Sequence, residues 1–353
     1  MKICILGPVT TKDYFGGVAV FNEALTKGFE NCGCEVVLCS RQKSDDILIK
    51  EMAFQRVSFL NINRIMRQEK PDAVIASLDY AVYFPLINSK IVKTYYLHGF
   101  FNIAHYGVLK AYLGWAYQKF FLRFCDRVYA NSFFTQMVNQ DIMGLRVDKA
   151  IPIGVSYTIL DKALESPKLT TKNNRKIIYV GRLAKSKFVD NIITTVKQLN
   201  MDGYECELEI LGDGPDARRL KKLSEGHNSI IFSGRVNHAT IYNKERQAEL
   251  FISLCPSESY GMSFVEALLA GCKIVCPITG GQNELIEEYE DRVIKVNPMS
   301  IESIMNGVKK AFSMESSSIL TNNMKSKFSY DETSSKIIED IADYIDHKAN
   351  SIS

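Results

Sequence analysis

Long hydrophobic runs and a strong charge of either sign are both missing from this sequence. A membrane-spanning helix needs about 18 consecutive apolar residues, and the 353 residues contain no such run. The chain starts with Met1-Lys2 and a short apolar run before Gly7, which favours a first strand over a signal peptide. The net charge of +3 is too small to indicate a nucleic-acid partner. We therefore expect a cytoplasmic protein that binds no nucleic acid.

Patterns that would bind a metal or a dinucleotide are missing as well. The nine Cys are scattered, and their closest cluster, Cys32, Cys34 and Cys39, lacks C-x-x-C spacing, so reduced packing thiols are predicted. No D-x-D triplet is available to hold a divalent ion on a diphosphate. No G-x-G-x-x-G occurs either, which disfavours a nicotinamide oxidoreductase. We expect neither a metal nor a cofactor.

One theme is repeated in both halves of the chain: a short apolar run, a turn and a helical pattern. Continuous apolar runs are typical of strands buried on both faces, and strands that alternate with helices predict parallel sheets. The predicted fold class is therefore α/β, with two doubly wound Rossmann-like domains facing each other across a cleft. The predicted strands are Lys2–Leu6, Glu35–Cys39, Ala73–Ser77, Thr94–Leu97, Arg127–Ala130, Ala150–Ile153, Lys176–Val180, Cys206–Leu211, Ile230–Ser233, Leu250–Leu254, Lys273–Cys276 and Val293–Val296.

The length of 353 residues also suits two domains better than one. Residues 161–175 are polar, aperiodic and rich in breakers, so we predict a linker there. The N-terminal domain would cover residues 1–160 and the C-terminal domain residues 161–331. A last helix at about residues 332–347 can pack back onto the first domain. Ligands of such sheets bind beyond the carboxyl ends of the strands, so the loops at those ends are the candidate site.

Two loops of the first half carry residues suited to ligands. Gly16 and Gly17 precede a predicted helix, where a glycine backbone and helix N–H groups can approach a phosphate, although a structural turn explains them equally well. His98 follows the strand Thr94–Leu97, where an imidazole can bind a sugar hydroxyl or move a proton. Since a lone His is more often structural, this residue by itself leaves both interpretations open.

The second half has basic and glycine-rich loops at its strand ends. Arg182 and Lys187 follow the strand that ends at Val180, and their charges can stabilise a leaving diphosphate much as a metal would. A solvated basic loop is the alternative. Gly212 follows the next strand and allows a tight turn or the close approach of a ligand.

The most informative segment runs from Cys255 to Gly271. Glu258 lies in the loop after a strand, and Glu266 is the only charged residue of the nearly apolar helix that follows. A buried carboxylate needs hydrogen-bond donors, which sugar hydroxyls supply, and an internal ion pair is the alternative. Backbone N–H groups at the start of this helix would form an anion site. They belong to Ser259, Tyr260, Gly261 and Met262.

Together these motifs resemble those of the family 4 retaining glycosyltransferases, which have the GT-B fold. The resemblance runs from the first strand to about Glu288. The matching motifs are the E-x7-E signature (Glu258 and Glu266), the diphosphate-binding pair (Arg182 and Lys187), the N-domain glycine loop (Gly16-Gly17) and the active-site histidine (His98). The chain departs from the family pattern at three positions, with Phe188 and Ser259 where Gly is common and Lys273 in place of Pro.

The resemblance implies a retaining, metal-independent transfer of a hexosyl or N-acetylhexosaminyl group from a nucleotide-diphosphate sugar, with a UDP-sugar as the expected donor. The acceptor would be a hydroxyl of a lipid-linked, glycan or protein substrate, as in bacterial surface polysaccharide or glycoconjugate synthesis. Glu258 would contact the donor sugar and Glu266 the ribose. The leaving phosphate oxygen would take the acceptor's proton, so the mechanism requires no protein nucleophile.

An aromatic and basic stretch bears on the acceptor. Residues 93–125 contain no acidic residue, and Leu113, Tyr117, Phe120 and Phe124 form one helical stripe. We interpret this stripe as packing into the core of the first domain, because an apolar stripe is normal on a globular helix. The alternative is peripheral contact with the inner face of the cell membrane, since basic charge with Trp and Tyr is typical of membrane-surface segments.

Two rival functions share the expected fold. A nucleotide-sugar epimerase would bind a donor without needing an acceptor, and the segment with Glu258 and Glu266 favours transfer over it. A non-catalytic partner subunit would have lost Glu258, Arg182 or Lys187, and all three are present.

Overall fold

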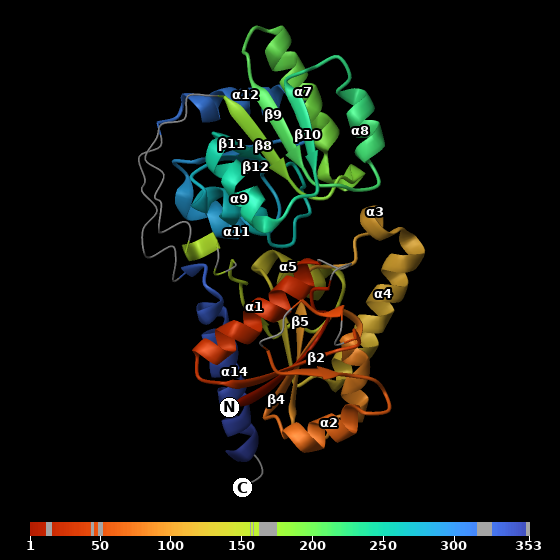
Figure 1. Cartoon of the computed structure of the whole chain (residues 1–353). Coiled ribbons are helices and arrows are strands. Elements are labelled where there is room, and N and C mark those ends of the chain that lie inside the picture. Colours follow the sequence, from red (N-terminus) through yellow and green to blue (C-terminus); the bar gives the residue numbers. More distant parts are fainter. Residues whose placement is uncertain are drawn as a thin grey trace. The chain divides into compact units, whose positions relative to one another are not determined.

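A computed structural model of the chain describes most residues between 1 and 350. The described ranges are 1–11, 16–43, 46–48, 52–155, 157, 159–161, 175–315 and 327–350. The chain divides into two compact units, Met1–Tyr157 with Lys325–Ser353 (unit 1) and Thr158–Met324 (unit 2), which are described one at a time (Figure 1). Most of the predicted linker, residues 162–174, lies outside the described residues.

Unit 1 is built on a parallel sheet with the strand order β3-β2-β1-β4-β5-β6-β7. The chain places β2 and β3 on one side of β1 and later strands on the other, so the topological switch point lies between β1 and β4. The strands are β1 Lys2–Leu6, β2 Glu35–Ser40, β3 Phe54–Arg56, β4 Ala73–Ser77, β5 Val92–Leu97, β6 Arg127–Ala130 and β7 Lys149–Ala150. Among these strands only β3 was not predicted, because it is a short edge strand with exposed residues. The predicted strand Ala150–Ile153 shares only Ala150 with β7.

Helices cover both faces of this sheet. Successive side chains of a strand point to opposite faces, so Ile3 and Ile5 pack with Phe21 of α1, whereas Cys4 and Leu6 pack on the other side. The helices of unit 1 are α1 Gly17–Asn31, α2 Ile62–Glu69, η2 Leu78–Leu86, α3 Ile103–Tyr106, α4 Val108–Phe121, η3 Leu122–Phe124, α5 Phe133–Met137, η4 Val138–Ile142 and α14 Tyr330–Asn350.

The C-terminal helix α14 belongs to unit 1, although in sequence it follows unit 2. It packs against α1, and the two helices lie side by side in Figure 1. Arg127 of β6 donates two hydrogen bonds to the carboxylate of Asp340 at 2.7 and 2.6 Å, and the hydroxyl of Tyr129 donates a third at 2.8 Å. Burial raises the pKa of Asp340, but these donors outweigh it and hold the pKa below its usual value. The ion pair therefore fixes α14 on the sheet.

The interpretation of the α4 stripe as core packing is wrong for most of its residues. Leu113 is 57% exposed, Phe120 50% and Phe124 38%, whereas Tyr117 is partly buried and donates a hydrogen bond to a backbone carbonyl at 2.7 Å. The residues that α4 turns toward the core are Ala111, Trp115, Gln118 and Phe121. Because α4 is apolar on both faces, its pattern could not indicate which stripe is buried.

Unit 2 is a second parallel sheet, with the strand order β10-β9-β8-β11-β12-β13 and its switch point between β8 and β11. Its strands are β8 Lys176–Val180, β9 Glu207–Leu211, β10 Ile230–Gly234, β11 Leu250–Ile252, β12 Lys273–Pro277 and β13 Val293–Val296. Its helices are η5 Lys185–Lys187, α7 Val189–Met201, α8 Ala217–Leu223, α9 His238–Gln247, α10 Met262–Leu269, α11 Gln282–Ile286, η6 Glu287–Tyr289 and α12 Ile301–Ser313.

Both faces of the second sheet are covered as well. Leu250 and Ile252 belong to a cluster with residues of α7 and α12, whereas Phe251 packs edge-on against Phe264 of α10, with ring centroids 5.2 Å apart. The nine cysteines are free thiols. None of the helices in the described ranges combines the length and the hydropathy needed to cross a bilayer.

Replacing Asp340 by Ala should destabilise unit 1, because Arg127 would keep its charge without its main partner. Removing one member of a largely buried ion pair costs about 3–5 kcal/mol, and the Asp340 side chain is only 9% exposed. The free energy of unfolding, measured in urea by circular dichroism, should fall by this amount. Asp343→Ala, at an exposed position of the same helix, is the control. Equal losses in both variants would contradict the assigned role.

Candidate active site

The carboxyl ends of the unit 2 strands bring most of the predicted donor-binding residues to one edge of the sheet. Lys187 follows β8 and Glu258 follows β11, and these strands are neighbours across the switch point. Gly212 follows β9, and Glu266 lies on α10 behind the β11 loop. The loops after parallel strands emerge at the same edge of a sheet, so residues distant in sequence meet there.

Lys187 and Glu258 form an ion pair at this edge. The Nζ atom of Lys187 donates a hydrogen bond to Oε2 of Glu258 at 2.6 Å, and the two side chains are 23% and 22% exposed. Burial lowers the pKa of Lys187, but Glu258 and Cys255 together raise it by more, so its pKa lies above the usual value. The pair therefore presents a fixed ammonium next to a carboxylate at the switch point.

Hydrogen bonds hold the loops that carry this pair. Lys187 ends the short helix η5, and the carbonyl of Glu258 accepts a hydrogen bond from the N–H of Gly281 at 2.8 Å. The hydroxyl of Thr279 donates to the carbonyl of Pro256 at 3.0 Å. The loops after β11 and β12 are thus tied to each other, which limits the movement of Glu258.

Arg182 adds an exposed positive charge on the loop of Lys187. The hydroxyl of Tyr179 donates a hydrogen bond to the Arg182 carbonyl at 3.0 Å, which fixes the backbone of the turn. No ion pair of the Arg182 guanidinium is found among the residues that the structure describes. An anionic ligand at this edge would therefore meet Arg182 without first displacing an acidic partner from it.

Gly212 and Gly261 occupy positions where a side chain would not fit. Gly212 has φ +138°, and a Cβ atom there would lie 1.9 Å from the carbonyl oxygen of Gly181. Gly261 has φ +89°, and a Cβ atom there would lie 2.8 Å from Cβ of Gln282. Gly261 also precedes the first residue of α10, Met262. Their backbones therefore pack directly against neighbouring loops at the edge where ligands of such sheets bind.

The other members of the predicted anion loop are less accessible. Tyr260 is buried, and Ser259 and Met262 are partly buried. They stand at the N-terminal end of α10, where the helix dipole favours negative charge.

Glu266 is buried beside a histidine that sequence reasoning missed. Its side chain is 8% exposed, and burial raises its pKa to about 7. The Nδ1 atom of His238, the first residue of α9, lies 3.9 Å from Oε1 of Glu266. The His238 side chain is 55% exposed, yet the surrounding protein lowers the pKa of its ring. His238 follows the end of β10 by a few residues, so the strand-end rule could have found it.

His98 in unit 1 ends a chain of hydrogen bonds. The hydroxyl of Ser77 donates to Oδ1 of Asn22 at 3.3 Å, and Nδ2 of Asn22 donates to the carbonyl of Pro8 at 2.8 Å. Because the Ser77 proton is used, the 3.1 Å contact between its Oγ and Nε2 of His98 requires Nε2–H as the donor. Burial lowers the pKa of His98 to about 3. The ring is therefore neutral, and its Nδ1 atom is the one that can accept a hydrogen bond.

Sequence reasoning missed both partners of His98. Ser77 is the last residue of β4, at the same sheet edge as His98, and Asn22 lies on the buried face of α1. An amide among the apolar residues of a helix was the available signal for Asn22. The switch point of unit 1 therefore holds a neutral imidazole whose tautomer is set by buried neighbours.

Gly16 and Gly17 begin α1, as expected. The carbonyl of Gly16 accepts hydrogen bonds from the N–H groups of Ala19 and Val20 at 2.9 and 3.2 Å. A Cβ atom on Gly17 would meet nothing within 4 Å, so packing does not require a glycine at this position. Residues 12–15 of the same loop lie outside the described residues.

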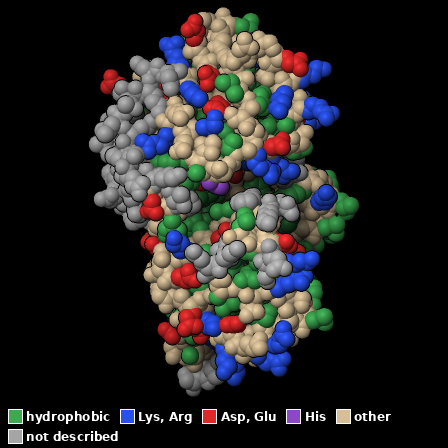
Figure 2. Space-filling model, in the orientation of Figure 1, with side chains coloured by type: hydrophobic (Ala, Val, Ile, Leu, Met, Phe, Trp, Pro, Cys, Tyr) green, Lys and Arg blue, Asp and Glu red, His purple; other side chains and the backbone are tan. Residues whose placement is uncertain are grey.

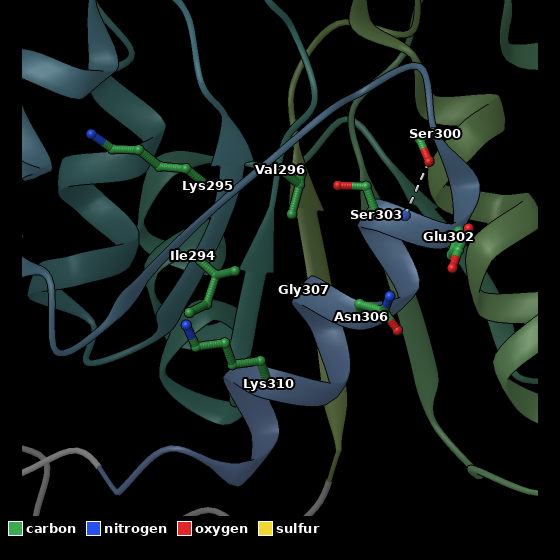
Figure 3. A pocket seen from close by; sticks show the side chains of 9 residues that line it. All are labelled: Ile294, Lys295, Val296, Ser300, Glu302, Ser303, Asn306, Gly307 and Lys310. Atoms are coloured by element: carbon green, nitrogen blue, oxygen red, sulfur yellow. Dashed lines mark hydrogen bonds between the residues drawn. The ribbon is translucent and has the colours of Figure 1, made fainter.

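A hollow of about 470 Å³ lies elsewhere in unit 2, on the edge strand β13 and helix α12 (Figure 3). Its lining residues are Ile294, Lys295, Val296, Ser300, Glu302, Ser303, Asn306, Gly307 and Lys310. The side chain of Ser300 accepts a hydrogen bond from the N–H of Ser303 at 3.2 Å, so it caps α12. The predicted site residues do not line this hollow.

Comparison with known proteins identifies the family. The family model described as Glycosyltransferase Family 4 matches residues 15–155, and the one described as Glycosyl transferases group 1 matches residues 161–328. The chain belongs to the family 4, group 1 glycosyltransferases. The E-x7-E segment and the Arg182–Lys187 loop fall within the second match, and His98 falls within the first.

Individual relatives of this chain are distant. An uncharacterized glycosyltransferase of Methanocaldococcus jannaschii is 32% identical over 172 residues, which are 47% of this chain and 41% of that relative. The match thus spans less than half of the relative's length. The structure of HepE from Anabaena in complex with UDP and glucose has a TM-score of 0.67 at 16% identity, and the match covers 100% of this chain and 99% of that one.

A UDP-GlcNAc 2-epimerase of Methanocaldococcus jannaschii shares the architecture, with a TM-score of 0.58 at 14% identity over 97% of this chain and 99% of that one. Such likenesses show the fold alone. They confirm the prediction of two parallel-sheet α/β domains of the GT-B type.

Phe188, one of the departures from the family pattern, occupies a left-handed position. Its φ is +52° and its ψ +36°, directly before α7, and this conformation costs a residue with a side chain about 1–2 kcal/mol. Glycine adopts it freely, which explains why Gly is common there. The Phe188 ring packs against the core of unit 2, which offsets the strain.

Lys273, another departure, is explained by a buried ion pair. Its side chain is 10% exposed and its Nζ lies 3.1 Å from Oε1 of Glu249, which is 6% exposed. A proline at this position could not supply the charge that Glu249 needs.

Phe188→Gly should be more stable than Phe188→Ala, although Ala is normally preferred. Both variants lose the ring, but only glycine relieves the left-handed strain, which is worth about 1 kcal/mol. Chemical unfolding of the two variants measures the difference. The same pair of substitutions at Lys185, on η5, should favour Ala and serves as the reference. If the Ala variant is also the more stable one at position 188, the assignment of a strained left-handed backbone to this residue is wrong.

Proposed function

We propose that the chain is a retaining glycosyltransferase that moves a hexosyl or N-acetylhexosaminyl group from a nucleotide-diphosphate sugar to an acceptor hydroxyl. Family membership supports glycosyl transfer. The observation that carries the site assignment is the ion pair between Lys187 and Glu258, 2.6 Å apart at the switch point of unit 2, with the exposed Arg182 on the same loop.

The positive charges of Arg182 and Lys187 stabilise the leaving diphosphate, as a divalent metal ion does in other enzymes. Loss of the nucleotide diphosphate leaves negative charge on the departing phosphate, which Arg182 and Lys187 stabilise through charge-assisted hydrogen bonds. Lys187 is already held by Glu258, so it needs little reorganisation. The N–H groups at the start of α10, from Ser259 to Met262, add partial positive charge.

The carboxylates are assigned to the hydroxyl groups of the donor. Glu258 accepts hydrogen bonds from the sugar, and Glu266 accepts them from the ribose. Because Glu258 is paired with an ammonium, it is a weak nucleophile. Attack of the acceptor on the same face as the leaving group, with the leaving phosphate oxygen taking the proton, fits this arrangement better than a covalent intermediate. The UDP and glucose bound to HepE support a UDP-sugar as the donor.

His98 serves as a neutral hydrogen-bond acceptor in this proposal. Its Nδ1 binds a sugar hydroxyl, while Ser77 and Asn22 hold the ring in the required tautomer. Gly16 and Gly17 lie at the start of α1 in the same unit, and the space beside the Gly17 backbone is open to a ligand.

The acceptor is a lipid-linked, glycan or protein hydroxyl, and the setting that we propose is bacterial surface polysaccharide or glycoconjugate synthesis at the cytoplasmic side. Neither a catalytic metal nor a cofactor takes part. The epimerase alternative has support only from the fold, and the partner-subunit alternative conflicts with the presence of Glu258, Arg182 and Lys187.

A panel of nucleotide sugars tests the proposal, with melting temperature and slow hydrolysis as the two measurements, with and without EDTA. A ligand that binds only the folded state raises the melting temperature. We expect one donor to stabilise the protein and to be hydrolysed equally with and without EDTA. Glu258→Ala should lose hydrolysis and keep its fold. If no donor binds, the result favours a non-catalytic partner subunit over a glycosyltransferase. If the sugar is epimerised, the protein is an epimerase and the proposed glycosyl transfer is wrong.

Lys187→Ala should lower the rate of donor cleavage by about 10²–10³-fold, because it removes a charge that stabilises the leaving diphosphate. Lys185→Ala removes an exposed lysine of the same short helix and should keep the wild-type rate. Single-turnover hydrolysis of the identified donor measures both variants. Similar rates in both would remove Lys187 from the reaction.

The affinity for the nucleotide should rise with pH through about 7, the value to which burial raises the pKa of Glu266. Only the ionised carboxylate accepts hydrogen bonds from both ribose hydroxyls, so binding favours the deprotonated form. Calorimetry between about pH 6 and pH 8 should show up to about tenfold tighter binding. Since the terminal phosphate titrates in the same range, Glu266→Gln is the reference. A pH dependence that is the same in both proteins would contradict the assignment.

A further inference from the structure

Helix α4 exposes an apolar surface of unusual extent for a helix of a globular domain. We call this surface the α4 outer face and define it by Val108, Leu109, Tyr112, Leu113 and Phe120 of α4 and by Phe124 of the adjoining η3. Their exposed fractions are 70, 70, 60, 57, 50 and 38%. They recur at the spacing of one helical stripe, and Ile103 of the preceding α3 adds a further side chain that is 60% exposed.

The opposite side of α4 is already packed in unit 1. Ala111 and Gln118 are 4 and 8% exposed, and the indole N–H of Trp115 donates a hydrogen bond to the carbonyl of Met143 at 2.8 Å. The fold therefore uses one side of the helix and leaves the other apolar side in contact with water. Such a surface is typical of a binding site, because single exposed apolar residues are common but contiguous ones are not.

Positive charge surrounds the α4 outer face. Lys110, Lys119 and Arg123 are exposed on and next to the helix, and residues 93–125 contain no acidic residue. In Figure 2, hydrophobic and basic side chains occur together where α3 and α4 lie in Figure 1. Lys119 also lies over the ring of Trp115, 4.8 Å from its centroid. An apolar, aromatic helix face bordered by cations is the pattern of a helix that lies in the interface of an anionic membrane.

We propose that the α4 outer face binds the surface of an anionic lipid bilayer, with the helix parallel to the membrane. The 14 residues of α4 extend over about 21 Å, which is shorter than the roughly 30 Å hydrocarbon core. Its apolar side chains enter the headgroup region, and Lys110, Lys119 and Arg123 contact lipid phosphates. A second copy of the chain fits less well, because a symmetric contact would bring these cations close to their own copies.

This inference does not rest on the proposed glycosyl transfer, since binding is measured without donor or acceptor. It does bear on the acceptor, because an enzyme held at a bilayer meets lipid-linked hydroxyls at a high local concentration. A protein that binds lipid but cleaves no donor would defeat the proposed function alone, and the reverse result would defeat this inference alone.

Sedimentation with vesicles tests the binding. One set contains only phosphatidylcholine and the other adds about a third of phosphatidylglycerol, within the anionic content to which basic segments respond. We expect the full chain to bind the anionic vesicles at least about tenfold more tightly, and to be released as salt screens the charges. Protein that stays in the supernatant with both sets would overturn the proposal.

Matched variants identify the surface. Leu109→Glu and the double variant Lys110→Glu/Arg123→Glu should each reduce binding to anionic vesicles by at least about tenfold. Their controls are Leu60→Glu, at a position that is 97% exposed in unit 1, and Arg64→Glu/Arg67→Glu, at exposed positions of α2. Both controls should bind like the wild type. Equal losses in the controls would show attraction that does not depend on α4 and would overturn the proposal.

Light scattering without lipid tests the rival occupant. We expect a mass that is the same for the wild type and for Leu109→Glu. A wild-type dimer that Leu109→Glu dissociates would show that a second copy covers the α4 outer face, and this result would also overturn the lipid proposal.

Discussion

The ion pair between Lys187 and Glu258 joins the loops that follow β8 and β11, the two strands on either side of the switch point in unit 2. Its geometry depends on the direction of the strands: because the whole sheet is parallel, both loops emerge at one edge. Hydrogen bonds to the β12 loop then limit the position of Glu258. The proposed reaction uses this arrangement, since a fixed ammonium can stabilise a departing diphosphate without a metal.

Burial shifts the pKa values of two further side chains in opposite directions. It raises the pKa of Glu266 to about 7 and lowers that of His98 to about 3, because a low-dielectric surrounding disfavours whichever form is charged. His98 is thus a neutral hydrogen-bond acceptor whose tautomer is set by Ser77. Hydrogen bonds from hydroxyl groups would stabilise the buried carboxylate of Glu266. Both properties suit uncharged sugar hydroxyls better than ionic ligands.

Several positions break a local rule, and for all but one of them the structure shows what compensates. The left-handed backbone of Phe188 is offset by the packing of its ring, and the buried Lys273 is paired with Glu249. Arg127 and Asp340 similarly anchor α14, which returns to unit 1 from the far end of the sequence. The α4 outer face is the exception, because nothing among the described residues compensates its exposure, and this contrast motivates an external partner.

Except for β3, the sequence by itself determined the strands, their parallel class and the strand-end loops of the candidate site. Buried strands have a continuous apolar pattern, and charged or glycine residues at their ends are visible without a structure. It could not determine which side of α4 is buried, because both sides are apolar, nor that His238 lies 3.9 Å from Glu266, because they belong to different strand–helix repeats. Only the tertiary structure decided these contacts and the tautomer of His98, since each depends on atoms that strand order brings together across long stretches of chain. The left-handed backbone at Phe188 was likewise visible only in the structure.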